Sequence, residues 1–569
     1  MKNQKLTSFL KTLSDAQKRE LNQLLESQID LSDNSQEDTE SPLKTDIKKS
    51  MLFPKTMISR IIENIELYRN YIFLLLLVAV YLILDYHTIL FARPQGIHFW
   101  RQTDSLSFVA NYYKNGFDFF HPRVFSLLST DGKAACEFPI LYYITALVYL
   151  IFNEHEFILR FITIMIASTG FFYLFKLLYS FLHDFLYASV FCFLFISSTV
   201  LLYYTNNFLP DASTLGMTLI AWYFFFIFLK NRNNKNALIV SFVFFSIASL
   251  IKVTYFINPV SAILTLLVYD FLEKKDIKST LTRNFKSLLF FCISLMAVLF
   301  WNLYVIHYNK INNDYAFLIQ SRPIWSINKV QIAQVWEHIT NYWYASYYYP
   351  HTFQVFSIII VTGIFLFKKA EREILIPSII LAIGSICYFL LFFAQFKDHD
   401  YYFIALIPGI LLLVINSFIA IKNKFPGLIN HYVVKILLLT LCMLSLNFAK
   451  GKLTQRYEKT DDMYANIGYT LSKTRHYMDL LGISKNAKVI IIADHTPNGG
   501  LYFINRPGWS VNDDSESIMA TVNDYIQKGA EYILFTDPKY IYKGFNGTII
   551  GENNGVSIFK LQKVIRTTP

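Results

Sequence analysis

Long apolar segments recur along this chain, and they constrain its fold more than any other feature of the sequence. A helix that crosses a bilayer needs about 20 consecutive, mostly apolar residues. Eleven segments come close to that length: 71–91, 157–180, 186–205, 210–229, 237–254, 255–272, 287–306, 351–367, 374–394, 402–421 and 433–449. The chain is 54% hydrophobic and only 16% charged. These features predict an all-α polytopic membrane protein with about eleven transmembrane helices.

One further apolar segment, residues 137–153, is short and begins with Glu-Phe-Pro, so it either crosses the membrane or lies in the interface. The basic loops decide between these possibilities. If the segment does not cross, four of them share a side with the basic N-terminal region, as the positive-inside rule requires. These loops are KNRNNK (230–235), EKKDIKSTLTRNFK (273–286), KKAERE (368–373) and KNKFPG (422–427). We therefore predict an interfacial helix over 137–153, a cytoplasmic N-terminus and an extracytoplasmic C-terminus.

Charge and cysteine usage exclude two other classes of protein. Much of the net charge of +11 lies in short clusters between apolar segments, so it indicates topology and argues against nucleic-acid binding. Four of the five cysteines lie inside apolar segments, and none forms a CxxC pair. The sequence therefore predicts neither a disulfide framework nor a zinc site.

Three regions follow from these patterns. Residues 1–65 are polar, with one amphipathic helical pattern followed by a solvated linker, and we expect them to be cytoplasmic. Residues 66–450 contain the apolar segments and form the transmembrane domain. Residues 451–569 predict a small extracytoplasmic α/β domain.

The C-terminal domain shows strand, helix and turn patterns. AKVIIIAD and EYILFTD are short apolar strands, and SESIMATVNDYIQKG between them has a helical period. GTIIGENNGVSIFKLQK predicts a hairpin with its turn at Asn553, Asn554 and Gly555. The loop in DHTPNGGLYFINRPGW, with Gly499 and Gly500, either contacts the acceptor or belongs to a stabilising cap that does not.

Polar residues far apart in the sequence meet on the outer face in this topology. GIHFWRQTDSLSF follows the first span and holds His98, Arg101 and Asp104. TNNFLPD ends in Asp211, and KVTYF begins with Lys252. Ionisable residues at membrane depth are costly and are site candidates by default. A lipid headgroup site on this face is therefore expected.

Asp104 has two interpretations. In TDSLSF, Thr103 or Asp104 could cap the start of a helix that runs to Tyr113. Alternatively, the Asp104 carboxylate is a general base that takes a proton from an acceptor hydroxyl, or orients the acceptor. Nearby, His98 and Arg101 are candidates for phosphate contacts, although an exposed arginine also anchors lipid headgroups.

Lys252 and His399 are the candidates for neutralising a phosphate. Lys252 either does so or snorkels from a helix end. His399 lies in FKDHDYYF between two aspartates. Tyr401 and Tyr402, which follow it, are further candidates for binding the donor phosphate or substrate, although the two tyrosines also suit an aromatic belt. Three adjacent residues rarely converge on one ion, so we expect no metal at this cluster.

Asp211 and Glu137 are candidates for acceptor contacts or for structural roles. Asp211 follows Pro210 at the start of a span, where a carboxylate also stabilises the helix by interacting with the positive end of its dipole. Glu137 opens the interfacial helix. The aromatic-rich loop 307–350 is either a platform for sugar or isoprenoid or a re-entrant interfacial segment.

In order, these segments resemble the C-type (GT-C) membrane glycosyltransferases: HFWRQTDSLSFVANYYKNGFDFFHPRV, EFPILYYITALVYLIF, LPDASTLGMTL, KVTYFINP and HDYYFIALIPG. The resemblance covers about residues 70–450 and is greatest with the branch of the dolichyl-phosphate-mannose–protein mannosyltransferases and the lipid A aminoarabinose transferase. It implies a hexosyl or pentosyl transferase of the plasma (inner) membrane. Such an enzyme takes a sugar from a polyprenyl-phosphate carrier on the outer face and gives it to a glycan, lipid or protein. Asp104 matches the family's essential acidic residue after the first span.

Two positions depart from the family pattern. Many relatives have Asp-Glu where this chain has Asp104 and Ser105, and Lys-Pro-Pro where it has Glu137-Phe138-Pro139. We therefore expect one catalytic carboxylate and a single inverting displacement. Lys252, His399 and Arg101 would stabilise the leaving phosphate as fixed positive charge. No cofactor or divalent metal is expected.

A transporter or flippase of lipid-linked sugars is the alternative from another class. Transporters tend to show internal repeats and polar residues at the midplane of the membrane. This chain shows no obvious repeat, and its polar residues gather near one surface. The sequence favours the enzyme.

Overall fold

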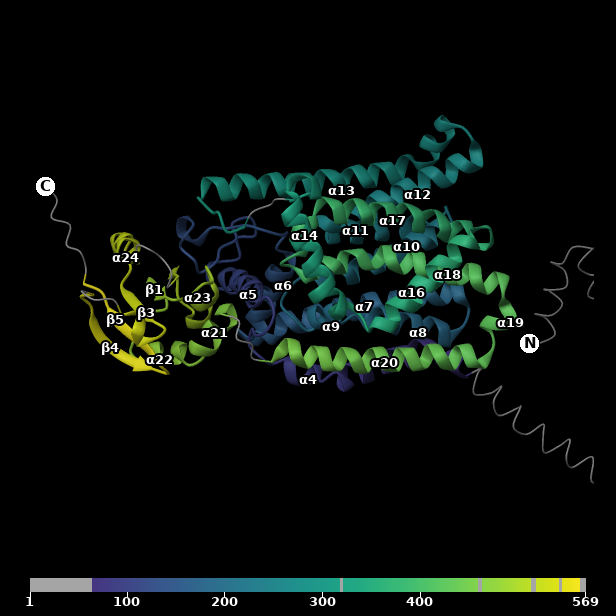
Figure 1. The fold of residues 1–569 in the computed structure, drawn as a ribbon. Coiled ribbons are helices and arrows are strands. Elements are labelled where there is room, and N and C mark those ends of the chain that lie inside the picture. The colour runs from purple at the N-terminus through teal and green to yellow at the C-terminus, as the bar shows by residue number, and fades with distance from the viewer. Residues whose placement is uncertain (1–63, 318–320, 459–462, 513–517, 542–544, 563–569) are drawn as a thin grey trace, which may run out of the picture. The chain divides into compact units, whose positions relative to one another are not determined.

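The computed structural model describes residues 64–317, 321–458, 463–512, 518–541 and 545–562. The amphipathic helix and linker predicted within residues 1–65 therefore lie outside the described residues, apart from the last two. The described residues from 70 onward form one compact unit, and its long helices run in roughly the same direction in Figure 1.

Eight helices of the described residues are long and apolar enough to cross a membrane. They are Asn64–Ile83, α7 (Phe157–Leu182), α10 (Asp211–Lys230), α12 (Ile257–Lys274) with the preceding turn η2 (Val253–Phe256), α13 (Ile277–Ile311), α17 (Arg372–Leu391), α18 (Ile407–Lys424) with the preceding turn η7 (Asp400–Leu406), and α20 (Tyr432–Tyr457). The pair α8 (Phe185–Ile196) and α9 (Thr199–Thr205), bent by 81°, would make a ninth span. The protein is thus a multi-pass membrane protein.

Two shorter apolar helices, α11 (Lys235–Ile251) and α16 (Pro350–Phe365), occupy the remaining predicted spans. Every apolar segment singled out from the sequence therefore contains a helix or a bent helix pair. The count of eleven crossings stays a prediction, because these two helices fall short of full spanning length.

The loop after the first span folds into two helices, α5 (Phe99–Lys114) and α6 (Ile140–Phe152), which pack against each other. With 13 residues, α6 is about 20 Å long, too short for a hydrocarbon core of about 30 Å. This length agrees with the predicted interfacial helix. Because α5 begins at Phe99, Asp104 lies inside the helix, and the N-cap interpretation of Asp104 is wrong.

The chain enters α5 through a tight turn on the end of α20. Gly96 has a φ of +73°, and a Cβ atom there would lie 2.2 Å from the backbone oxygen of Arg456. His98 follows in the left-handed conformation, with a φ of 56°, as the N-cap of α5. Only glycine fits the close approach at position 96, so this contact fixes where α5 starts.

The buried helix α10 crosses α7 at two glycines. A Cβ atom on Gly170 would lie 2.3 Å from the Cα atom of Gly216, so the two backbones touch at this crossing. Small residues allow such close approach between membrane helices. The packing fixes α10, which carries Asp211 in its first turn.

The C-terminal region contains a five-stranded sheet of order β2-β1-β3-β5-β4. The strands are β1 (Val489–Ile492), β2 (Gly508–Val511), β3 (Tyr532–Phe535), β4 (Thr548–Asn553) and β5 (Val556–Lys560). The helices are α21 (Met463–Thr470), α22 (Thr474–Leu480), α23 (Gly499–Ile504) and α24 (Ile518–Gln527). β1 pairs in parallel with β2 and β3, whereas β5 is antiparallel to β3 and β4.

The predicted strands β1 and β3 and the predicted terminal hairpin are present. The hairpin turns at Asn554 and Gly555, which both have positive φ. The short edge strand β2 was not predicted, because GWSV lacks a clear apolar alternation. The boundary at residue 450 stays a prediction, because this region belongs to the same compact unit as the helices.

Candidate active site

A cavity of about 710 Å³ lies at one end of the helices, next to the C-terminal region. All nine side chains singled out from the sequence line this cavity: His98, Arg101, Asp104, Glu137, Asp211, Lys252, His399, Tyr401 and Tyr402. They come from α5 and its N-cap, the segment before α6, the start of α10, the end of α11 and the segment between α17 and α18. These nine residues lie up to 304 positions apart in the sequence, from His98 to Tyr402, and line one cavity.

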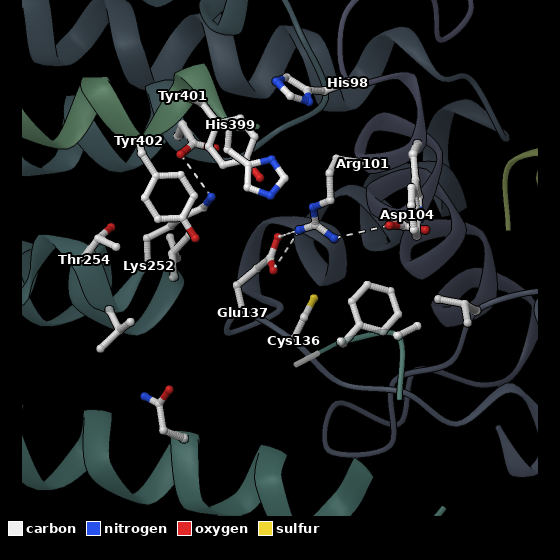
Figure 2. A pocket seen from close by; sticks show the side chains of 18 of the residues that line it. His98, Arg101, Asp104, Cys136, Glu137, Lys252, Thr254, His399, Tyr401 and Tyr402 are labelled. Carbon is white, nitrogen blue, oxygen red and sulfur yellow. Dashed lines mark hydrogen bonds and ion pairs between the residues drawn. The ribbon is translucent and has the colours of Figure 1, made fainter. Parts of the chain in front are cut away.

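Arg101 joins two carboxylates on one side of the cavity. One of its terminal nitrogens donates to Glu137 at 2.9 and 3.1 Å, and the other donates to Asp104 Oδ2 at 3.3 Å. The Tyr142 hydroxyl donates to Glu137 Oε1 at 2.6 Å. Figure 2 shows the guanidinium between the two carboxylates. Because Arg101 is committed to both, its charge is largely compensated before any substrate enters.

The two carboxylates ionise differently. Burial raises the pKa of Asp104 from 3.8 to about 7, although Arg101 and Asn498 act in the opposite direction. Burial alone would also raise the pKa of Glu137, but Arg101 and Lys252 lower it to about 2. Two carboxyl groups with separated pKa values are typical of distinct chemical roles. Glu137 is a permanent counter-ion, whereas Asp104 gains and loses its proton near neutrality.

Lys252 occupies the facing side of the cavity, beside Tyr401 and Tyr402 (Figure 2). Its ammonium lies 3.0 Å from Asp211 Oδ1 and 4.6 Å from the centroid of the Tyr401 ring. The second oxygen of Asp211 is buried and has no hydrogen-bond partner in the structure. Lys252 therefore lies in the cavity with one counter-ion and does not simply snorkel along a helix end.

His98 belongs to a buried hydrogen-bond network at the edge of the cavity, at the top of Figure 2. Its Nε2 lies 3.2 Å from Asp400 Oδ1, which also accepts from the Tyr204 hydroxyl at 2.7 Å. Arg456 donates to the other Asp400 oxygen at 2.7 Å. The network links the start of α5 to the end of α20. It also gives a structural role to Asp400, one of the two aspartates that flank His399 in the sequence.

His399 is a neutral side chain in this environment. Burial lowers its pKa to about 3, and the positive charges of Arg101 and Lys252 add to the effect. Its Nδ1 atom is buried and has no hydrogen-bond partner in the structure. His399 can therefore exchange a hydrogen bond with a ligand near neutral pH, but it does not carry the fixed positive charge expected from the sequence.

The aromatic loop 307–350 divides into two parts. Asp314, Ala316 and Phe317 line the cavity. The later part forms η3 (Ile324–Ser326), α14 (Lys329–His338), the π-helical turn η4 (Ile339–Trp343) and α15 (Tyr344–Tyr347), and none of these elements lines the cavity. Trp336 of α14 packs against Phe389 and Phe393. Of the described residues in this loop, those that line the cavity lie before η3: Asp314, Ala316, Phe317 and Ser321.

Sequence reasoning missed several residues of the site. Asn498 reaches the cavity from the C-terminal region, and its Nδ2 lies 3.3 Å from Asp104 Oδ1. Cys136 and Asp314 also line the cavity. The glycine pair after Asn498 was the only signal for this loop in the sequence. In the part of the chain that the structure describes, no three His, Cys, Asp or Glu side chains are grouped so that they could hold a metal ion.

A membrane domain of this architecture, with a polar cavity under a C-terminal α/β region, has the fold of the C-type membrane glycosyltransferases. Residues 135–312 match the family described as dolichyl-phosphate-mannose-protein mannosyltransferase. No curated protein is significantly similar to the chain in sequence.

Solved structures share the fold at low sequence identity. Apo ArnT from Cupriavidus metallidurans is 12% identical, with a TM-score of 0.54 over 85% of this chain and 97% of that one. The same protein bound to undecaprenyl phosphate is also 12% identical over the same shares, with a TM-score of 0.53. The apo oligosaccharyltransferase from Archaeoglobus fulgidus is 12% identical, with a TM-score of 0.51 over 82% of this chain and 69% of that one. The resemblance predicted from the sequence is confirmed.

Proposed function

We propose that this protein is a membrane glycosyltransferase that moves a hexose or pentose from a polyprenyl-phosphate carrier to a glycan, lipid or protein acceptor. One observation carries the proposal: the buried carboxyl group of Asp104 and the ammonium of Lys252 line the same cavity. The first can accept a hydroxyl proton, and the second can stabilise a leaving phosphate. The binding of undecaprenyl phosphate by ArnT, which has a similar fold, supports this choice of carrier.

The proposed topology has eleven spans, with the cavity on the outer face of the plasma (inner) membrane. The cavity lies where α10 begins and α11 ends, whereas the basic loops 230–235, 273–286, 368–373 and 422–427 join the opposite helix ends. Because basic loops stay cytoplasmic, the positive-inside rule supports an outward-facing cavity. The C-terminal region would then also be extracytoplasmic.

In the proposed reaction, ionised Asp104 accepts the proton of the acceptor hydroxyl as its oxygen attacks the anomeric carbon. The bond from that carbon to the phosphate oxygen breaks in the same step, so the configuration inverts. The polyprenyl phosphate leaves with the bonding electron pair, and Lys252 stabilises the added negative charge. His399 offers a hydrogen bond, and Arg101 holds Asp104 in place. A phosphate leaves without protonation by a strong acid, so a second catalytic carboxyl group, as in glycosidases, is unnecessary.

The test incubates purified protein with labelled polyprenyl-phosphate sugars and membrane extract, and compares wild type with Asp104→Asn. Asp118→Asn is the matched control, because Asp118 lies in the same outer loop but pairs with His121 away from the cavity. We expect transfer of label by wild type and by the control, and near-complete loss in Asp104→Asn. Equal transfer by all three proteins would remove Asp104 from the mechanism. If no carrier is consumed, the transporter or flippase alternative is favoured.

A further inference from the structure

We propose that Asn498, which belongs to the C-terminal region, is a positioning residue that orients Asp104 for proton transfer. The inference rests on the proposed function. It makes the C-terminal region part of the active site instead of a cap that only stabilises the protein. Three features of the structure support this role: the hydrogen bonds of Asn498, the loop that holds it, and the attachment of the C-terminal region to the loop between α5 and α6.

The hydrogen bonds of Asn498 fix the direction of its side-chain amide. Its oxygen accepts from the backbone amides of Phe125 and Ser126, at 3.1 and 3.3 Å, and from the Ser107 hydroxyl at 3.3 Å. A backbone N–H can only donate, so the amide oxygen must face these groups. The NH₂ group must therefore face Asp104, where Nδ2 donates to Oδ1 at 3.3 Å.

A tightly built loop, DHTPNGG, holds Asn498. The buried Asp494 carboxylate accepts from the backbone and the hydroxyl of Thr496, at 2.9 and 2.6 Å, and from the backbone of Gly500 at 3.0 Å. A Cβ atom on Gly499 would lie 2.5 Å from the Thr496 hydroxyl, and one on Gly500 would lie 2.4 Å from Asp494. A Cβ atom on either glycine would therefore displace a side chain that closes this loop around Asn498.

Backbone pairing attaches the C-terminal region to the loop between α5 and α6. The Gly508 amide donates to the Phe125 oxygen at 3.0 Å, and the Leu127 amide donates to the Gly508 oxygen at 2.7 Å. The Trp509 indole donates to the Leu127 oxygen at 3.0 Å. The outer loop thus extends the sheet at β2, beside the amides that hold Asn498. The pairing holds the backbone of Phe125 and Ser126, whose amides donate to Asn498, against the C-terminal region.

The hydrogen bond from Asn498 affects both the orientation and the pKa of the Asp104 carboxylate. Asn498 and Arg101 each donate to a different oxygen of the carboxylate, which fixes its plane. Glu137, from the segment before α6, is the nearby like charge. Donors favour the ionised carboxylate, so the Asn498 contact opposes the effect of burial on the pKa of Asp104. Loss of Asn498 should therefore move the titration of Asp104 to higher pH.

Two variants separate positioning from added charge. Asn498→Ala removes the donor without introducing charge, whereas Asn498→Asp keeps an acceptor towards Phe125 and Ser126 and places a second carboxyl group beside Asp104. For Asn498→Ala we expect kcat to fall about 10- to 100-fold, as for a misaligned catalytic group. The KM for the donor should stay the same, and the acidic limb of the pH–rate profile should move to higher pH. Asn498→Asp should move the limb further in the same direction.

The matched control is Asn505→Ala, at the other end of α23. Asn505 is also buried and accepts a hydrogen bond from Lys114 of α5, so its loss also removes a contact between the C-terminal region and α5. It does not line the cavity. We expect Asn505→Ala to lower the melting temperature without moving the pH–rate profile. The same kcat loss in both alanine variants, with an unmoved acidic limb, would overturn the positioning role.

A second measurement does not depend on activity. Hydrophobic carbodiimides react with protonated carboxyl groups, so mass-spectrometric labelling of Asp104 across pH reports its titration. We expect the labelling midpoint of Asn498→Ala above that of wild type, and an unchanged midpoint overturns the inference. If wild type transfers no sugar, the proposed function fails while this readout still tests the contact. If Asn498→Ala does not fold, Asn498→Asp carries the same test.

Discussion

Replacing Asp104 by asparagine should nearly abolish transfer and yet make the protein harder to unfold at neutral pH. The carboxyl group is 1% exposed, and its pKa is raised from 3.8 to about 7. In the unfolded chain the group ionises at its usual pKa, so the folded state binds this proton more tightly. Stability contributed by the bound proton is complete below about pH 4 and is lost as the pH rises through about 7.

The size of this effect follows from the shift. A difference of about three pKa units corresponds to about 4 kcal/mol, since one unit is about 1.4 kcal/mol. For a chain of 569 residues, an unfolding entropy of about 2.1 cal/mol/K per residue converts this to about 3 °C in melting temperature. An asparagine side chain does not ionise, so Asp104→Asn should not lose this stability as the pH rises. Arg101 keeps its ion pair with Glu137 in the variant.

Thermal unfolding of wild type and Asp104→Asn from pH 4 to pH 8 tests this reasoning. Other titrating groups are common to both proteins and cancel in the difference. We expect equal melting temperatures near pH 4 and a variant that is about 3 °C more stable at pH 8. Transfer by the variant should fall about 10²- to 10⁴-fold, the usual contribution of a general base. A difference that is constant with pH, or a less stable variant at pH 8, would refute the account of Asp104.

Three further predictions concern the rest of the cavity. Lys252→Gln should lower kcat about 10²- to 10³-fold in steady-state assays, because it removes the charge that stabilises the leaving phosphate; an unchanged rate would exclude that role. Glu137→Gln should move the acidic limb of the pH–rate profile to lower pH, because Glu137 raises the pKa of Asp104 and shares Arg101 with it; a shift to higher pH would contradict this. Chelators should leave the transfer rate unchanged, and a loss that added metal ions restore would contradict the metal-free proposal.

The sequence was sufficient to predict nine of the side chains that line the cavity, because the predicted topology places them on one face. In the predicted topology Asp104 follows the first span, and Asp211 and Lys252 lie at helix ends on the same face. Counting crossings and reading the basic loops therefore assigned all three residues to that face. That argument fixes the face on which a side chain lies but not its neighbours. It could not show that Arg101 is paired with Glu137 or that burial keeps His399 neutral.

Contacts between distant segments could not be predicted from local patterns. Arg456 lies late in a long apolar helix, and nothing near it in the sequence indicates its pairing with Asp400. Asn498 meets Asp104 across 394 positions of sequence, where the loop between α5 and α6 extends the sheet at Gly508. The start of α5 was misplaced because its N-terminal turn is set by the close contact at Gly96 and not by a capping side chain.

The central claim is that the phosphate of the lipid carrier binds in the cavity that contains Asp104. A cryo-electron microscopy structure of the purified protein with a polyprenyl phosphate tests it most directly. The account predicts phosphate density within hydrogen-bonding distance of Lys252, on the facing side of the cavity from Asp104. Phosphate density outside the cavity, or at the helix ends joined by the basic loops, would contradict it.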